Sequence, residues 1–197
     1  MSLKNLLSTA IVVTLLASCQ SKSSTATDGE QSGVEKNLLY TSDWKAVTDL
    51  IGSSYSPDKA VVRDSLMEVS FTLKKKEEGE IVFIELVCSL DSTLSASKGL
   101  EITYKCDSPL VIKLSQSDFG GDGDESYAHY QFIVPASETL NTVRVNYESF
   151  TQPEWTPEAS KGKAMKLENV NAIYLTPDVD ATIGGSATLA VKSLYLH

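Results

Sequence analysis

The chain has 197 residues, a formal net charge of −9 and a hydrophobic content of 42%. The acidic surplus argues against a nucleic-acid partner and against attachment to anionic lipid through basic patches. The chain has only two histidines and no Cys-x-x-Cys pair, which argues against a zinc site of ordinary spacing.

Residues 1–18 have the composition of a signal peptide. Lys4 supplies a positive start, and the apolar run 6–16 is too short to span a bilayer as a helix. The Leu-Ala-Ser-Cys sequence that ends at Cys19 resembles the lipobox of bacterial lipoproteins, in which the cysteine becomes the lipidated first residue of the mature chain. An ordinary signal peptide with an incidental cysteine is the alternative.

The lipobox resemblance implies a location for the protein. Bacterial lipoproteins carry more than one acyl chain, such as palmitate, and two or more such chains give stable membrane anchoring. Gln20 follows the cysteine, where an aspartate would suggest retention in the inner membrane by the enterobacterial rule. We therefore expect a lipid anchor in the outer membrane or at the cell surface. Residues 19–37 are rich in Ser, Thr and Gly, which predicts a flexible tether.

Short strand-like runs fill the remainder of the chain, and we expect one domain over 38–197. The runs lie at 38–41, 59–62, 66–73, 81–88, 99–106, 109–116, 126–134, 141–147, 171–176 and 187–196. Weak helical signals occur at 43–50 and 157–166. Many short strands separated by turn residues predict an all-β fold, an antiparallel β-sandwich of jelly-roll type.

Alternation of apolar and polar residues assigns two faces to the strands at 110–116, 127–134 and 142–147. The apolar faces form the predicted core, because burying each large apolar side chain contributes about 1.5–3 kcal/mol. The other face combines aromatic, amide, hydroxyl and cationic groups, and sugars are bound by groups of these kinds. The expected carbohydrate contacts are Lys113, Tyr127, His129, Gln131, Arg144 and Asn146, with Ser115 on the same face. A solvated sheet face without a ligand is the alternative.

Two further groups of residues could form sites. Asp118, Asp122 and Asp124 lie in a glycine-rich loop and could hold calcium, which prefers oxygen ligands, or could form a flexible acidic hairpin tip. Cys88 and Cys106 each lie at the end of a strand-like run. They could form a disulfide in an exported protein, or remain as two buried free thiols.

The chain shows no catalytic motif. It contains no Gly-x-Ser-x-Gly sequence, and its densest group of carboxylates lies in a loop that we expect to be exposed, where pKa values are hard to shift. His129, Ser115 and Asp118 imitate a catalytic triad in residue type only. We therefore expect a protein that is not an enzyme.

The order of the motifs resembles a known group of domains. SASKGLEITY at 95–104 is followed by SPLVIKLSQSD, NTVRVNYESFTQPEW, NVNAIYLTPD and a closing SLYL. This order is similar to galactose-binding-like jelly rolls close to carbohydrate-binding module family eleven and the complex I intermediate-associated protein family. The matching positions are Val143, Val145, Phe150, Pro153, Trp155, Ile173, Leu175 and Pro177. Tyr147 stands where phenylalanine is usual, and the closing strand lacks the acidic pair often found there, which puts in doubt a calcium site built on that pair.

The resemblance implies a jelly roll that binds carbohydrate, and it favours Trp155 as a plug at the end of the sandwich over a place at the rim of the ligand face. Together with the lipobox, it predicts a surface-anchored lipoprotein that binds a polysaccharide without catalysis. The alternative is a structural or assembly lipoprotein whose sandwich binds a protein partner.

Overall fold

A computed structural model describes residues 36–57 and 62–197 of the chain. The predicted signal peptide, Cys19, residues 19–35 of the predicted tether and residues 59–61 lie outside the described residues. Among the residues that are described, no helix is long and apolar enough to cross a membrane.

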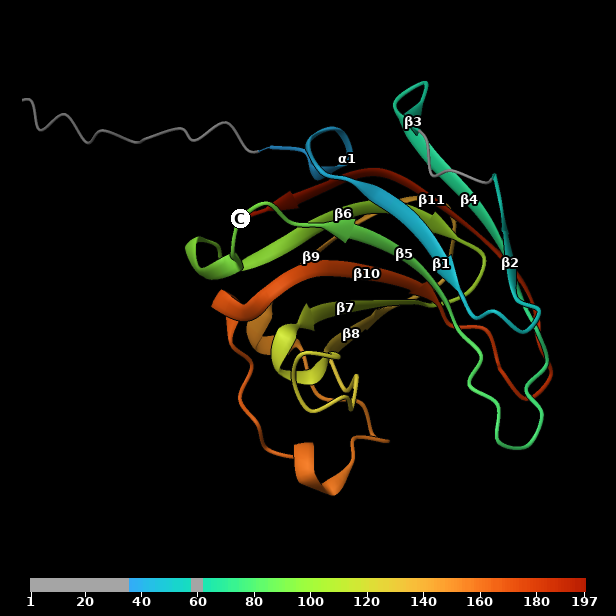
Figure 1. Cartoon of the computed structure of the whole chain (residues 1–197). Helices are drawn as coiled ribbons and strands as arrows, with labels where there is room; N and C mark the ends of the chain where they lie inside the picture. The colour runs from blue at the N-terminus through green and yellow to red at the C-terminus, as the bar shows by residue number, and fades with distance from the viewer. Residues whose placement is uncertain (1–35, 58–61) are drawn as a thin grey trace, which may run out of the picture. The chain divides into compact units, whose positions relative to one another are not determined.

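Two antiparallel sheets form the domain (Figure 1). The five-stranded sheet has the order β1-β5-β10-β7-β8, and the six-stranded sheet combines the order β2-β4-β11-β6-β9 with β3, which pairs with β4. The strands are β1 (Trp44–Thr48), β2 (Ser54–Ser56), β3 (Val62–Arg63), β4 (Leu66–Leu73), β5 (Ile84–Ser89), β6 (Gly99–Cys106), β7 (Leu110–Gln116), β8 (Tyr130–Val134), β9 (Ser137–Asn146), β10 (Val170–Pro177) and β11 (Gly185–Leu196). The predicted all-β sandwich is confirmed.

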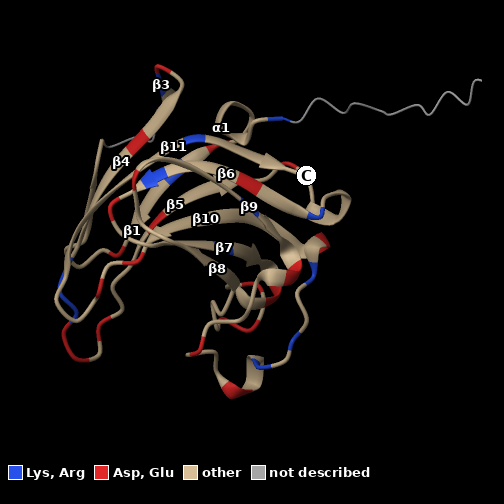
Figure 2. Ribbon diagram, turned by 180° about the vertical axis from the view of Figure 1, so that it is seen from behind, with Lys and Arg blue, Asp and Glu red and all other residues tan. Residues whose placement is uncertain are grey.

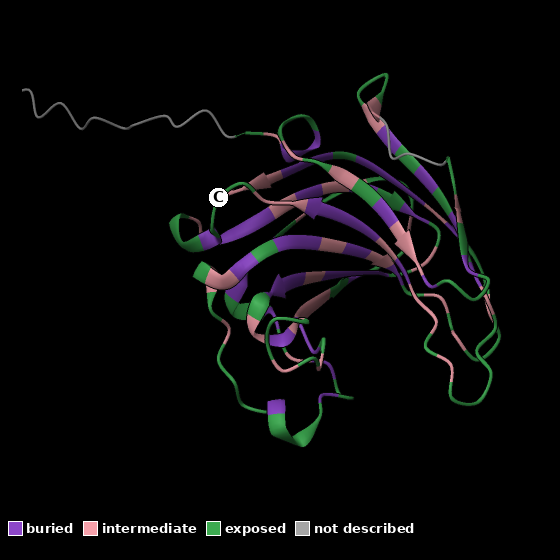
Figure 3. Ribbon diagram, in the orientation of Figure 1, coloured by how far each residue is buried: buried purple, intermediate pink, exposed green. Residues whose placement is uncertain are grey.

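The core lies between the two sheets, and alternation along the strands builds it. In β7, Leu110, Ile112 and Leu114 are fully buried in the core cluster. In β4, Met67 to Leu73 alternate between buried and exposed positions, and Phe71 points into the sandwich. Figure 3 shows this alternation along β4, whereas β7 is buried along most of its length. A period of two therefore sends the large apolar side chains of each strand to one side.

Two short segments differ from the sequence-based expectation. Residues 38–41 form the single helical turn α1 (Leu38–Thr41) and not a strand, because the Asn37 side chain caps it by accepting a hydrogen bond from the Leu39 N–H. The reverse holds for 43–50, which contains the strand β1 and not a helix, because β1 pairs with β5 along its whole length. In 157–166, only Glu158–Ser160 forms a 3-10 turn.

The two cysteines remain free thiols. Cys88 lies on β5 of the five-stranded sheet and Cys106 on β6 of the six-stranded sheet, and both side chains are buried. The disulfide alternative is therefore wrong: β5 and β6 lie in different sheets, and no bond joins the two thiols.

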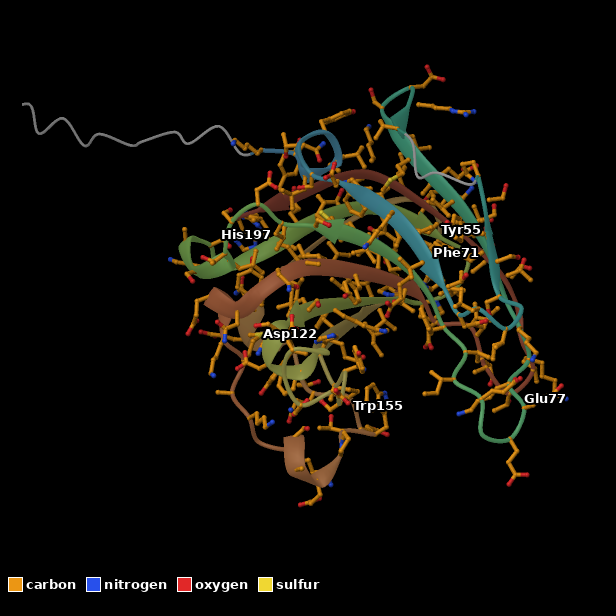
Figure 4. The ribbon with its side chains drawn as sticks, viewed as in Figure 1. Tyr55, Phe71, Glu77, Asp122, Trp155 and His197 are labelled. Carbon is orange, nitrogen blue, oxygen red and sulfur yellow. The ribbon has the colours of Figure 1, made fainter. Side chains whose placement is uncertain are left out.

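Most of the strand surface carries no formal charge, and many of the acidic residues lie in the connecting loops (Figure 2). One such loop joins β4 to β5, with the exposed Glu77 near its tip (Figure 4). A second runs from 117 to 129 between β7 and β8. The second loop lies beside the outer face of the five-stranded sheet, where the polar side chains considered next are found.

Candidate functional site

The outer face of the five-stranded sheet carries a row of side chains that crosses all five strands. The strand registers place Lys45 opposite Val87, Val87 opposite Tyr174, Tyr174 opposite Lys113, and Lys113 opposite Gln131. Their neighbours along the strands, such as Leu86, Ile112 and Leu114, point into the core. The row therefore points away from the core. Its middle member, Tyr174, has Lys113 on one side and Val87, followed by Lys45, on the other.

Lys113 is fixed in this row by an ion pair. Its Nζ lies 2.7 Å from Oε1 of Glu85 on β5, and both side chains are mostly shielded from solvent. The pair spans β10, which lies between β5 and β7. The lysine is thereby held over the sheet, where a ligand would meet a hydrogen-bond donor and a carboxylate at fixed positions.

A pocket of about 190 Å³ lies at one end of this face. Its lining includes Ser115 and Gln116 at the end of β7, Tyr174 on β10, and Tyr127 and His129 on the segment that leads into β8. The hydroxyl of Ser115 donates to the phenol oxygen of Tyr174 at 3.2 Å. The pocket thus combines aromatic rings with hydroxyl, amide and imidazole groups, as small-molecule sites commonly do.

His129 is a neutral member of the pocket at physiological pH. Only 4% of the residue is exposed, and its Nδ1 accepts a hydrogen bond from the backbone N–H of Gln116 at 3.3 Å. Burial lowers the pKa of His129 to about 4, and the positive charge of Lys113 lowers it further than the negative charge of Asp124 raises it. Since Nδ1 accepts, the neutral ring carries its proton on Nε2, which is a hydrogen-bond donor.

The aromatic rings of the pocket contact one another edge to face. The ring centroid of His129 lies 5.8 Å from that of Tyr174 and 6.3 Å from that of Tyr127, and both pairs have T-shaped geometry. Tyr127 itself is 58% exposed, so most of its ring is open to solvent. An exposed aromatic ring beside a polar pocket can stack against the apolar face of a ring-shaped ligand.

Gln116 contributes to the pocket but does not offer it a free side-chain donor. Its place after Leu110, Ile112 and Leu114 in the alternation of β7 puts its side chain on the core side of the sheet. Its side-chain oxygen accepts from the backbone N–H of Lys166 at 3.2 Å, while its Nε2 is buried from solvent and has no partner among the described residues. A ligand in the pocket therefore does not reach this nitrogen.

Two of the expected contacts lie elsewhere. Arg144 and Asn146 belong to β9, at the edge of the six-stranded sheet, where Arg144 is paired with Glu101 of β6 at 3.7 Å. The expectation that all six residues share one face is therefore wrong. The other four expected contacts lie together at the five-stranded sheet, because β7 and β8 are neighbours in it. They are Lys113, Tyr127, His129 and Gln131.

The aspartates of the acidic loop bind partners within the protein. Asp118 accepts from Lys166 at 2.9 Å and from Asn169 at 2.6 Å, and these contacts, the Asn169 hydrogen bond first, lower its pKa. Asp124 is bound by Lys163 and by the Ser160 hydroxyl. No group of three His, Cys, Asp or Glu side chains within residues 36–57 and 62–197 is arranged to hold a metal ion. Asp118, Asp122 and Asp124 thus do not form the expected calcium site, because two of them are engaged by cationic and polar side chains.

Trp155 also departs from the expectation. The residue is 60% exposed in the loop after β9, so it does not plug the end of the sandwich. Its loop is attached to the five-stranded sheet, since Thr151 forms an isolated bridge with Gln131 on β8. Figure 4 shows Trp155 and Asp122 in the loops below β7 and β8.

Sequence reasoning missed Glu85 and Tyr174. The alternation in 170–177 separates Tyr174 from the buried Ile173 and Leu175, so this ring could have been assigned to the polar face. Glu85 could have been found in the same way, between the buried Ile84 and Leu86.

The fold is an all-β sandwich with known structural counterparts. The family 11 carbohydrate-binding module of a cellulosomal cellulase of Clostridium thermocellum is similar with a TM-score of 0.58 at 17% sequence identity, over 82% of this chain and 93% of the module. A family 11 module from Clostridium thermocellum in complex with a β-1,3-1,4-mixed-linked tetrasaccharide is similar with a TM-score of 0.57 at 16% identity, over 78% of this chain and 88% of that one.

The solution structure of CtCBM11 is a third counterpart, with a TM-score of 0.53 at 20% identity, over 78% of this chain and 87% of that one. No protein-family model and no curated protein sequence matches the chain. At these identities the likeness defines the jelly-roll fold, which agrees with the fold implied by the resemblance to family eleven.

Proposed function

We propose that this protein is a surface-anchored lipoprotein whose β-sandwich binds carbohydrate without catalysis. The observation that carries the proposal is the outer face of the five-stranded sheet, where Tyr174, Lys113 and Gln131 stand in one row beside the polar pocket. Aromatic faces and fixed amide, hydroxyl and ammonium donors are the groups that match a sugar ring and its hydroxyls.

The likeness to family 11 modules supports the same class of ligand, since one of them is seen with a β-1,3-1,4-mixed-linked tetrasaccharide. The non-catalytic part of the proposal is supported by the position of the carboxylates. Glu85 is paired with Lys113, and Asp118 and Asp124 are paired with lysines, so each is engaged by a cation and is not a free acid or base.

The surface anchor is supported by the sequence alone, through the lipobox that ends at Cys19. In this proposal the lipid would hold the protein on the outer membrane or cell surface, and the tether would present the sandwich to glycans outside. A lipid anchor and a glycan-binding face fit the same task of capturing a polysaccharide at the cell surface.

Titration of the purified chain with glycans tests the proposal. Mixed-linkage β-1,3-1,4-glucan is the first probe, and xylan and mannan extend the panel. Replacing Tyr174→Ala should weaken binding about tenfold or more, because about 1.4 kcal/mol of ring contact corresponds to a factor of ten. Arg144→Ala, on the other sheet, is the matched control and should bind like the parent. Equal affinity of the parent and Tyr174→Ala, with both folded, would reject this face as the site.

A second candidate function is favoured by Trp155. A large aromatic side chain that is 60% exposed is a common feature of protein interfaces. An assembly lipoprotein would bury this ring against a protein partner. If no glycan binds, and a stoichiometric partner is recovered with the parent chain but not with Trp155→Ala, this second function replaces the first.

A further inference from the structure

The pocket beside Tyr174 is closed at one end by the loop that follows β7. Residues 117–122 of this loop contribute Ser117, Gly120, Gly121 and Asp122 to its lining, while β7 and β10 supply the floor. The row of side chains formed by Gln131, Lys113, Tyr174, Val87 and Lys45 continues over the sheet in the other direction. The candidate site is therefore a sheet face that ends in a pocket.

The closing loop is held firmly in place. The backbone N–H of Tyr127 donates to the oxygen of Phe119 at 2.7 Å, and Phe119 is fully buried beneath the loop. Gly123 packs so closely that a Cβ there would collide with the backbone oxygen of Asp118. The Asp118 and Asp124 contacts to 160–169 fix the loop from its other side. The wall is thus preorganised, and a polymer lying on the sheet would meet it.

One buried polar side chain of the pocket offers a donor to a ligand. His129 lines the pocket, with its Nδ1 occupied by the Gln116 N–H and its Nε2 therefore the protonated nitrogen. The Nε2 of Gln116, by contrast, is closed off from solvent and from the pocket. The pocket accordingly offers one fixed donor to a ligand oxygen, with the exposed ring of Tyr127 beside it.

We propose that this pocket holds the terminal sugar residue of the bound glycan, so that the protein recognises the end of a carbohydrate chain and not its interior. This inference rests on the proposed carbohydrate-binding function. A terminal residue has one hydroxyl more than an internal one, and the Nε2 donor of His129 matches such an additional acceptor. An internal residue would require the chain to continue through the loop wall.

Comparison of oligosaccharides with their parent polymers tests the inference. The probes are the mixed-linkage glucan, xylan and mannan, each with short oligosaccharides of the same linkage, titrated calorimetrically into the purified chain. For the glycan that binds, the affinity per chain end should be equal for the polymer and the oligosaccharide. Because a given mass of oligosaccharide contains many more chain ends than the same mass of polymer, it should bind far more protein. Blocking one end of the oligosaccharide should weaken binding at least about tenfold, and blocking the other end should not.

The opposite results separate the inference from the function on which it rests. If a polymer binds several copies of the protein along its length with the per-residue affinity of its oligosaccharides, chain-end recognition is overturned and the carbohydrate-binding function stands. If neither polymers nor oligosaccharides bind, both are overturned.

Two variants connect the result to the pocket. His129→Asn keeps a side-chain oxygen that can accept from the Gln116 N–H and removes the Nε2 donor, so it should weaken oligosaccharide binding about tenfold. Tyr127→Asn removes an exposed ring at a position of φ 53°, a conformation that asparagine tolerates, so this variant should fold even if the first does not. Arg144→Ala is the control for both. Unchanged end-dependent binding in Tyr127→Asn and in a folded His129→Asn would remove the pocket from the interaction.

Discussion

At the scale of single residues, the buried thiols allow a direct test of the sandwich. Burial raises the pKa of Cys88 to about 12, more than a weak contact with Ser42 lowers it, and burial likewise raises the pKa of Cys106. Thiols in this state are protonated and inaccessible, and therefore unreactive. In the Cys19→Ala chain, we expect no reaction with a thiol reagent under native conditions and two reactive thiols after unfolding without reductant. Fewer than two after unfolding would contradict the free-thiol state of Cys88 and Cys106.

Asp49 supplies a pH-dependent contribution to stability. Burial by itself would raise the pKa of Asp49, but hydrogen bonds from Ser53, Ile51 and Phe83 together lower it from 3.8 to about 2. The carboxylate of Asp49 thus binds a proton less readily in the folded state than in the unfolded state. The stabilisation that Asp49 contributes is complete above its unfolded pKa of 3.8 and is lost as the pH falls toward 2.

Asp49→Asn should therefore reduce the free energy of unfolding by about 2 kcal/mol at pH 7, with a difference that shrinks as the pH falls below 4. Urea denaturation at a series of pH values measures this change. Asp64→Asn is the control, because Asp64 is exposed and its positive φ suits asparagine as well as aspartate. A difference that stays constant from pH 7 to pH 3 would show that the charge of Asp49 is not the cause.

Residue patterns predict some features of the site and not others. Alternation predicts which side of each strand faces the core, because apolar burial dominates that choice, and it places Lys113 and Gln131 correctly on the outer side. It also places Arg144 on an outer side, but it contains no information on which sheet the strand joins. That depends on long-range pairing, here of β9 with β6. Four of the six expected contacts therefore meet at one face, and two lie on the other sheet.

At the scale of elements, the shortest segments are the least predictable. Residues 38–41 and 43–50 are each brief, so their periodicity cannot separate a helical turn from a strand. Tertiary contacts decide both. The Asn37 cap and the hydrogen bond from the Trp44 indole to the Leu38 oxygen at 2.9 Å fix the turn, while pairing with β5 fixes the strand β1. The longer strands β4, β6, β7, β10 and β11 agree closely with their predicted ranges because their alternation is sustained.

Side chains of the acidic loop 117–129 connect this loop to the loop 152–169. Asp124 receives hydrogen bonds, first from Lys163 and then from Ser126 and Ser160, and these hold its pKa well below its usual range. The Tyr130 hydroxyl adds a contact to the Lys163 oxygen at 2.8 Å. The loop 152–169 is therefore attached to the loop 117–129 by side chains and not by strand pairing, which makes this attachment sensitive to single substitutions.

Asp124→Asn should loosen the 157–166 segment and leave the sandwich intact. We expect trypsin to cut after Lys161 or Lys163 several-fold faster than in the parent, because local opening becomes easier while the melting temperature changes little. Glu125→Gln, an exposed neighbour in the same loop, is the matched control. Mass spectrometry of early fragments locates the cuts. Equal cleavage rates in Asp124→Asn and the control would mean that Asp124 does not hold the segment.

At the scale of the whole molecule, the first described residues are attached to the last strand of the sandwich. Asn37 accepts hydrogen bonds from the Leu39 N–H and from the Leu194 N–H of β11, both at 3.1 Å. This residue links the start of the described domain to its last strand. A change upstream of this point should therefore alter the attachment of the protein to a membrane without altering its fold.

Cys19→Ala tests this separation together with the proposed lipid anchor. Expressed in a bacterium, the parent chain should enter the membrane fraction, and an inhibitor of lipoprotein signal peptidase should leave a larger, unprocessed precursor. The Cys19→Ala chain should no longer be held in the membrane by acyl chains, because one cysteine carries the whole anchor. Its melting temperature should equal that of the parent, and Ser24→Ala should stay with the membrane as the control. Retention of Cys19→Ala in the membrane fraction would contradict lipidation, and a lowered melting temperature would show that the folded domain depends on residues upstream of Asn37.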